Sequence, residues 1–243
     1  MKLIIAGASG FVATEVIRQC LSIPKITSVI AVARRPISAP VDLVQSADAS
    51  KLHSVVLDDY DSYPDGVRQE FANADACIWT VAITPSKSRG LEFDEVRRVC
   101  HDYTLAGLQA IFEAHGKSGS NAAPLRFMYM SGSAAQRDPK EVPRFMSKYL
   151  LMRGETENQV LGFAMEHNGA VEACVSKPGL ITAPGQLLKT IIATVLKPFV
   201  PSVGVKEISA AMLHQVLNGF EKETLQNDDL VRIGRQALSD VRE

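Results

Sequence analysis

A glycine-containing turn near the start of the chain has the residue types that bind phosphate. Residues 2–13 read KLIIAGASGFVA: a short apolar run, a Gly-Ala-Ser-Gly turn, and an apolar stretch typical of a helix. Gly7 permits a tight turn, and Gly10 lets the backbone approach an anion. At the start of a helix, the N–H groups of residues 9–12 would face phosphate oxygens. The alternative is an ordinary strand–turn–helix with incidental glycines. The pattern predicts a dinucleotide site that includes Gly7, Ser9, Gly10, Phe11 and Val12.

Two arginines bear on which dinucleotide this is. Arg34 and Arg35 follow the apolar, β-branched run at 27–33, and no Asp or Glu comes before Asp42. NAD sites commonly place an acidic residue here for the ribose 2′-hydroxyl, whereas a guanidinium suits a 2′-phosphate. The alternative is a solvated basic pair at a strand end. We therefore expect NADP(H).

Two further positions are expected to border the dinucleotide. Asp58 follows the predicted strand 53–57 and could accept a hydrogen bond from an adenine amino group, or could simply form a turn. Ala82 lies in residues 81–83, where the backbone should pass the adenine ribose and the pyrophosphate.

Tyr149 and Arg153 have the spacing and residue types for proton transfer. A separation of four residues places them on one helix face. An unperturbed phenol has a pKa of about 10, which an adjacent cation lowers. Hydride transfer to a carbonyl leaves an alkoxide, and a positioned phenol can supply its proton. The alternative is that Arg153 pairs with Glu157 and Tyr149 only packs on its helix.

Strand-like and helix-like segments alternate along the chain, which predicts an α/β fold with a doubly wound parallel sheet. We expect a single Rossmann-type domain over 1–243, with strand order 3-2-1-4-5-6, one further edge strand, and a mainly helical substrate-side part at 180–243. Ligands bind beyond the carboxyl ends of such strands. The predicted strands are 3–6, 27–33, 53–57, 76–83, 125–130 and 170–176, and the predicted helices are 11–21, 67–73, 93–115, 144–166 and 205–220.

Short motifs in the expected order give the chain a specific resemblance. They are GASGFVA at 7–13, RR at 34–35, Asp58, HDYTLAG at 101–107, SGS at 131–133, YLLMRGETE at 149–157 and KPGLI at 177–181. Over nearly its whole length the chain resembles the atypical or extended short-chain dehydrogenases/reductases, especially the small NAD(P)-binding proteins common in fungi.

The resemblance implies roles for particular residues. Ser133 would orient a substrate carbonyl and Tyr149 would act as general acid, with Ser131 in reserve because Gly132 lets either hydroxyl point inward. Pro178 and Gly179 would position the nicotinamide. The family has a lysine four residues after the tyrosine, and here that position is Arg153. Arginine can still bond the nicotinamide ribose, but it does not deprotonate, which puts a proton relay in doubt.

Composition excludes several functional classes. Apolar residues make up 46% and charged residues 22%, and the net charge of −1 without long basic runs argues against nucleic-acid binding. No apolar stretch reaches the ~18 residues of a membrane span. A strand beginning at the second residue leaves no room for a signal peptide, so we expect a cytoplasmic protein. The four cysteines are scattered in apolar segments and predict reduced core residues, and no metal-ligand cluster is present.

These patterns favour an NADPH-dependent reductase or dehydrogenase that acts on a carbonyl or conjugated group of a small, specialised metabolite. The apolar run at 187–201 could be a substrate lid, a dimer face or core, and as a lid it predicts a largely apolar substrate. The long helices at 93–115 and 144–166 could form a homodimer or simply cover the sheet. The alternatives are an isomerase, epimerase or cyclase that retains NADP(H), and a non-enzymatic dinucleotide sensor.

Overall fold

The computed structural model describes residues 1–116, 123–183 and 201–240. Within them a seven-stranded, wholly parallel sheet has the order β3-β2-β1-β4-β5-β6-β9. The expected order and the further edge strand are therefore confirmed. The strands are β1 (Lys2–Ala6), β2 (Ser28–Ala33), β3 (Leu52–Val56), β4 (Ala76–Trp79), β5 (Leu125–Met130), β6 (Val171–Lys177) and β9 (Thr224–Gln226).

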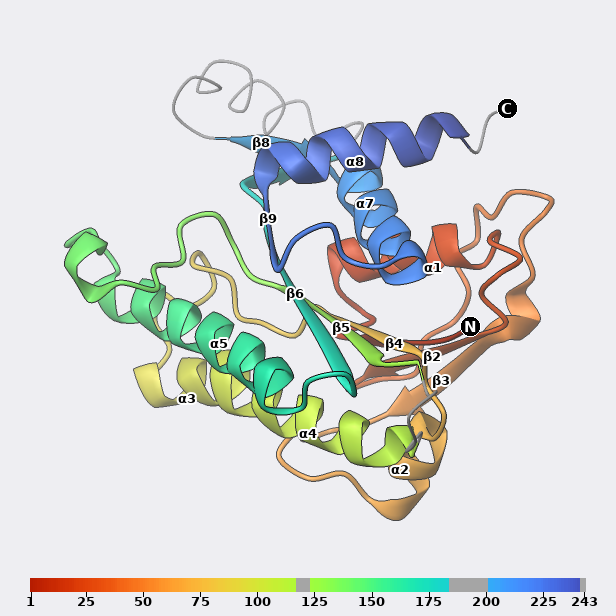
Figure 1. Cartoon of the computed structure of the whole chain (residues 1–243), viewed down its shortest axis with the longest axis horizontal. Coiled ribbons are helices and arrows are strands. Elements are labelled where there is room, and N and C mark those ends of the chain that lie inside the picture. The colour runs from red at the N-terminus through yellow and green to blue at the C-terminus, as the bar shows by residue number, and fades with distance from the viewer. Residues whose placement is uncertain (117–122, 184–200, 241–243) are drawn as a thin grey trace.

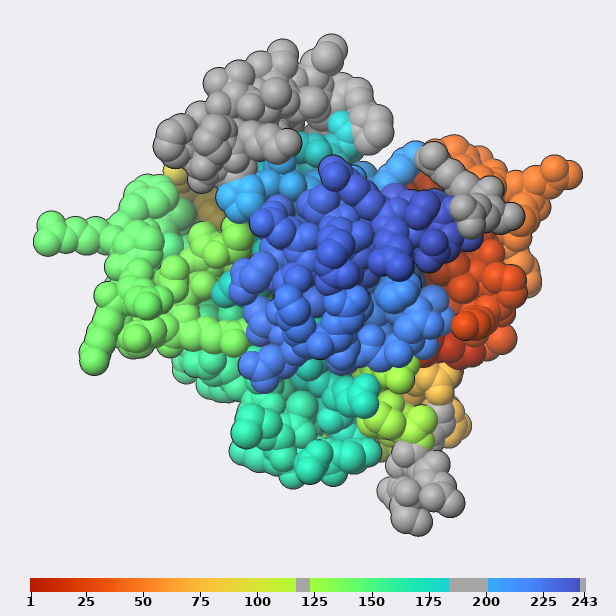
Figure 2. All heavy atoms as spheres, turned by 45° about the horizontal axis from the view of Figure 1, so that its top comes forward, coloured from red at the N-terminus to blue at the C-terminus, as the bar shows by residue number. Residues whose placement is uncertain are grey.

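Helices cover both faces of this sheet (Figure 1). One face carries α1 (Phe11–Cys20), α7 (Val205–Asn218) and α8 (Asn227–Asp240), and the other carries α2 (Asp65–Phe71), α3 (Phe93–Arg97), α4 (Tyr103–His115) and α5 (Ser147–Glu166). In the space-filling view, α8 and α7 form a continuous blue layer next to the red N-terminal segment (Figure 2). A separate short pair is formed by β7 (Leu180–Thr182) and β8 (Ser202–Gly204).

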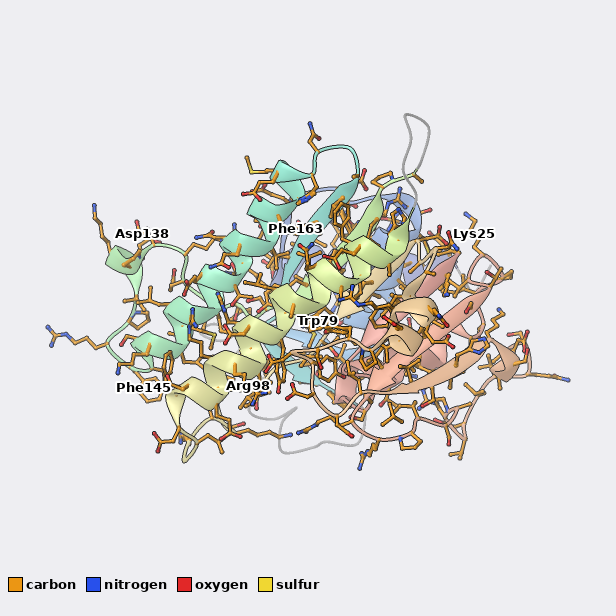
Figure 3. All side chains as sticks on the ribbon, turned by 90° about the horizontal axis from the view of Figure 1, so that it is seen from below. Lys25, Trp79, Arg98, Asp138, Phe145 and Phe163 are labelled. Atoms are coloured by element: carbon orange, nitrogen blue, oxygen red, sulfur yellow. The ribbon has the colours of Figure 1, made fainter. Side chains whose placement is uncertain are left out.

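The apolar run of β1 shows why the sheet is buried on both sides. Leu3 and Ile5 pack into the core under α1 and α7, whereas Ile4 and Ala6 pack into the core under α4. Alternate residues of a strand point to opposite faces, so a continuous apolar run fits a sheet covered twice. On the α4 side, Trp79 lies beneath that helix (Figure 3). Gly107 makes room for it, because a Cβ there would overlap the indole ring.

Two predicted boundaries differ from the structure by more than two residues, and one predicted helix is not α-helical throughout. The strand predicted at 76–83 ends at Trp79, because the Thr80 hydroxyl donates to the Ala6 carbonyl (2.8 Å) and turns the chain toward the glycine loop. The helix predicted from residue 144 begins at Ser147, since Met146 has a left-handed backbone (φ 56°). The helix predicted at 93–115 contains a π-helical segment, Arg98–Asp102.

Candidate active site

The glycine turn adopts the conformation that phosphate binding requires. Gly7 has φ +78°, and a Cβ on it would lie 2.7 Å from Thr80 Oγ1. The N–H groups of Gly7 and Ala8 both donate to the Val32 carbonyl (3.0 Å each), and the Gly10 N–H donates to the Gly7 carbonyl (2.8 Å). The turn is therefore held between the ends of β2 and β4, and only glycine fits at its first position.

The N-terminus of α1 lies directly after this turn. Gly10 is its N-cap and has no side chain to satisfy the first N–H groups of the helix. Helix geometry leaves the N–H groups of Phe11, Val12 and Ala13 without partners inside the helix. Ser9 is exposed and Phe11 is 47% exposed, so this end is open to solvent. The arrangement can take an anion.

Arg34 and Arg35 follow β2 at the same edge of the sheet. Both side chains are exposed, and neither forms an ion pair with another described residue. Asp58, one residue beyond Leu57, is also exposed after β3. The three side chains are thus available to a ligand at this edge.

Tyr60 is a residue of this region that sequence reasoning missed. Its hydroxyl donates to the Val32 carbonyl (3.2 Å), the same oxygen that accepts from Gly7 and Ala8. Burial raises the pKa of Tyr60 to about 12, so the phenol stays protonated. Its hydroxyl therefore remains a donor to the carbonyl that also binds the glycine turn. A tyrosine after the third strand has no recognisable motif, which is why the sequence did not reveal it.

Tyr149 is anchored to the segment that follows β4. Its hydroxyl donates to the Ile83 carbonyl (2.9 Å), and the Ile83 N–H donates to Cys100 Sγ (3.2 Å). Ala82 and Met152 pack in the same small apolar cluster. Burial raises the pKa of the Tyr149 phenol above its ordinary value, and Arg153 acts in the opposite direction.

Arg153 is buried, and it does not pair with Glu157. The side chain is 4% exposed; its Nη2 donates to the Met130 carbonyl (2.9 Å), and the guanidinium lies over the Tyr129 ring (5.1 Å). Its Nη1 is buried and has no hydrogen-bond partner among the described residues. The alternative of a pair between Arg153 and Glu157 is therefore wrong, because Glu157 is occupied by other cations.

The two candidate serines differ in what they contact. Ser131 donates its hydroxyl to Glu157 Oε1 (2.5 Å), so that hydroxyl is committed within the protein. Ser133 is exposed, and its backbone N–H donates to the Pro178 carbonyl (2.8 Å). No hydrogen bond in the described part of the chain links the Ser133 side chain to Tyr149. Ser133 is thus hydrogen-bonded to the residue that follows β6, and Tyr149 is hydrogen-bonded to the segment after β4.

Pro178 and Gly179 leave β6 at the same edge. The Gly179 N–H donates to Asn227 Oδ1 at the start of α8 (3.0 Å), and a Cβ on Gly179 would overlap the Pro201 carbonyl. Close packing therefore requires glycine here. The run predicted at 187–201 lies, apart from Pro201, outside the described residues.

Other expectations concern cysteines, metals and membranes. Cys20, Cys77, Cys100 and Cys174 are free and buried, as expected. Among described residues, no three His, Cys, Asp or Glu side chains gather as metal ligands would. In the same part of the chain, no helix combines the length and apolar character needed to cross a membrane.

The direction of the Tyr149 pKa gives a testable expectation. Because burial raises its pKa, the Tyr149 phenol should remain protonated at neutral pH and ionise at a higher pH than an ordinary tyrosine. The difference in absorbance at 295 nm between the wild type and Tyr149→Phe, followed from pH 7 to 11, measures this. The same titration of Arg153→Met should move the ionisation to still higher pH. Ionisation of Tyr149 near pH 8 would contradict the expectation.

Comparison with known proteins supports the fold assignment. No protein-family model and no curated protein sequence matches the chain. Among solved structures, it is similar to MoeE5 in complex with UDP-glucuronic acid and NAD (17% identity, TM-score 0.66, covering 93% of this chain and 75% of that one). It is also similar to vestitone reductase from alfalfa (19% identity, TM-score 0.63, covering 93% of this chain and 76% of that one).

A third similar structure is the dTDP-glucose 4,6-dehydratase DesIV from Streptomyces venezuelae with NAD and TYD bound (14%, TM-score 0.65, 98% and 81%). These likenesses confirm the expected Rossmann-type fold. At these identities the likeness carries the fold alone, and the reaction has to be argued from the site.

Proposed function

We propose that the protein binds NADP(H) and catalyses hydride transfer between this cofactor and a carbonyl or conjugated group of a small molecule. The observation that carries the proposal is the pairing of an open phosphate-binding turn with Arg34 and Arg35 on neighbouring strands of one sheet edge. The structures of similar fold with bound NAD support a nicotinamide dinucleotide.

The proposed cofactor contacts follow from the geometry of that edge. The N–H groups of residues 11–13 and the glycine turn hold the pyrophosphate, and Arg34 and Arg35 hold the 2′-phosphate. Asp58 lies near the adenine. At the nicotinamide half of the cofactor, Arg153 bonds the ribose through Nη1, which is buried and has no hydrogen-bond partner among the described residues. The list of proposed contacts is completed by Ser9, Ala82, Pro178 and Gly179.

The proposed chemistry assigns one task to each catalytic side chain. Bound NADPH supplies the hydride. Ser133 donates a hydrogen bond to the substrate carbonyl, and Tyr149 supplies the proton once its hydroxyl leaves the Ile83 carbonyl. A raised pKa keeps the Tyr149 phenol protonated at neutral pH, which is the form that donates a proton in the reduction step. Arg153 adds a positive charge that stabilises the developing phenolate.

The proposal extends to the class of substrate and the cellular setting. A largely apolar, specialised metabolite fits the composition of the run at 187–201. A C-terminal part at 180–243 on the substrate side, a homodimer and a cytoplasmic location complete the proposal.

A second candidate function is favoured by the contacts of Tyr149. Its hydroxyl is bound to a backbone carbonyl, and a lysine is replaced by Arg153, which cannot relay a proton. Retention of NADP(H) in an isomerase, epimerase or cyclase, or a dinucleotide sensor, would tolerate this arrangement. One of the structures of similar fold is that of a UDP-glucose 4-epimerase.

The decisive experiment uses NADPH carrying deuterium at the transferable position. The protein is incubated with it and a mixture of small carbonyl compounds, and products are read by mass spectrometry. A reductase places deuterium in one product and consumes NADPH, and Tyr149→Phe should slow this at least about 100-fold. Conversion without label or NADPH loss favours the isomerase class. Tight binding without conversion, unchanged in Tyr149→Phe, favours the sensor.

A further inference from the structure

A buried carboxylate on α5 connects several segments at the edge of the candidate active site. Glu157 lies one helical turn beyond Arg153 and has no exposed surface. Its Oε1 accepts from Ser131 Oγ (2.5 Å), its Oε2 accepts from Arg137 Nε (2.7 Å), and Lys177 Nζ lies 2.9 Å from both oxygens. We refer to these four residues as the Glu157 cluster.

The two cations of the Glu157 cluster extend its contacts to the backbone and to the sheet edge. Lys177 Nζ also donates to the Ala135 carbonyl (2.8 Å), and Arg137 Nη2 donates to Thr224 Oγ1 of β9 (2.9 Å). One carboxylate thereby links α5 to the end of β5, the loop at 131–137, the end of β6, and β9.

Residues of the Glu157 cluster adjoin, along the chain, the residues proposed to contact the substrate and the nicotinamide. Ser133 lies in the loop between Ser131 and Arg137, and its N–H bonds to the Pro178 carbonyl. Pro178 and Gly179 directly follow Lys177 in the chain. A change in the cluster would therefore displace both sides of this part of the site together.

The free-energy cost of burying the Glu157 carboxylate indicates that the cluster does more than stabilise the fold. Removing a carboxylate from water costs several kcal/mol, and apolar residues of similar volume often stabilise a core as well or better. Buried charges can instead select one arrangement of the chain. The loop is also pressed against α5, because a Cβ on Gly154 would overlap the Gln136 carbonyl. Loop and helix are thus fitted to each other around Glu157.

We propose that Glu157 is a positioning residue that holds Ser133 and the Pro178–Gly179 turn in the arrangement that the nicotinamide end of the cofactor requires. It acts through Ser131, Arg137 and Lys177 and touches neither cofactor nor substrate. The identity of the ligand rests on the proposed function, whereas the hold on the loop does not.

The hold on the loop is tested by amide hydrogen exchange. In Glu157→Gln the loop loses its charged anchor, and we expect exchange of the amides at 131–137, that of Ser133 above all, to accelerate about tenfold. The matched control is Glu155→Gln, two residues earlier on α5, where the side chain is exposed. The control should leave exchange in this loop unchanged.

The consequence for the site is tested with two ligands. Adenosine 2′,5′-bisphosphate contacts only the adenine half, whereas NADPH also reports the nicotinamide by its fluorescence. Glu157→Gln should weaken NADPH binding about fivefold and reduce the fluorescence gain on binding, while bisphosphate affinity stays within about twofold. A purely structural role would lower the affinity for both ligands equally, or for neither.

A milder variant tests the same proposal even if the Glu157→Gln protein does not fold. Ser131→Ala removes one hydrogen bond and leaves both cations on Glu157, and it should change the same two measurements in the same direction by about twofold. Unchanged exchange and unchanged NADPH fluorescence in both variants would overturn the proposal. If the wild type does not bind NADPH, the proposed function fails, and hydrogen exchange alone decides whether Glu157 holds the loop.

Discussion

Replacing Arg34 and Arg35 together with alanine should lower the affinity for NADPH about 100-fold and leave the affinity for NADH within about twofold. Charge-assisted hydrogen bonds to a phosphate are worth roughly 1.5–3 kcal/mol each, and two partly solvated ones reach the ~2.7 kcal/mol of a 100-fold change. Both arginines are exposed and without ion pairs among the described residues, so their loss should not disturb the fold.

Calorimetric titration of both cofactors measures this selectivity. A matched control is Lys25→Ala combined with Arg144→Ala, which removes the same charge from two exposed positions that form no ion pairs in the described part of the chain. The two control positions lie far apart from each other, because Figure 3 shows Lys25 at the opposite end of the molecule from Phe145, the neighbour of Arg144. Equal losses for NADPH and NADH would exclude recognition of the 2′-phosphate by the arginine pair.

The substitution Gly7→Ala should reduce the affinity for either dinucleotide at least about 100-fold and lower the free energy of unfolding by about 2 kcal/mol. A left-handed backbone costs a residue with a Cβ roughly 1–2 kcal/mol. The added atom would also lie 2.7 Å from Thr80 Oγ1 and 3.1 Å from the Val81 nitrogen. Relief of these contacts would move the turn away from β4 and displace the N–H groups that we propose bind the pyrophosphate.

Urea unfolding and fluorescence titration with NADPH measure the two effects. Gly66→Ala is the control, because Gly66 lies in the first turn of α2 without a left-handed backbone, and no neighbouring atom lies within 4 Å of an added Cβ. It should leave binding unchanged and alter stability by less than about 1 kcal/mol. If Gly7→Ala bound NADPH as tightly as the wild type, the glycine turn would not be the pyrophosphate site.

Local sequence was sufficient for the elements that depend on neighbouring residues. The Gly7 turn and the position of the arginine pair after β2 follow from apolar runs and glycine positions, because backbone conformation and burial pattern are largely local. The strand order was expected from assigning these elements to the Rossmann type. The same reasoning put Tyr149 and Arg153 on one face of a helix, and both lie on α5.

Contacts across the sheet were beyond local reasoning. Nothing near Tyr149 in the sequence indicates that its hydroxyl would reach the Ile83 carbonyl, 66 residues earlier. Helical spacing offered Arg153, four residues away on the same helix, as an alternative partner of Glu157, yet the actual partners are Arg137 and Lys177. Helical spacing permits a pair, whereas the direction that each side chain takes is decided by what surrounds the helix.

The sequence by itself determined the doubly wound sheet and the residues that lie at its carboxyl edge, because strand and helix periodicity and glycine turns are encoded locally. Only the tertiary structure decided which of those side chains are free for a ligand. It commits Ser131 to Glu157 and leaves Ser133 exposed, and it buries Arg153 with one donor that has no partner in the described part of the chain. The physical reason is that buried polar groups find their partners among segments that folding brings together, at separations that sequence spacing does not record.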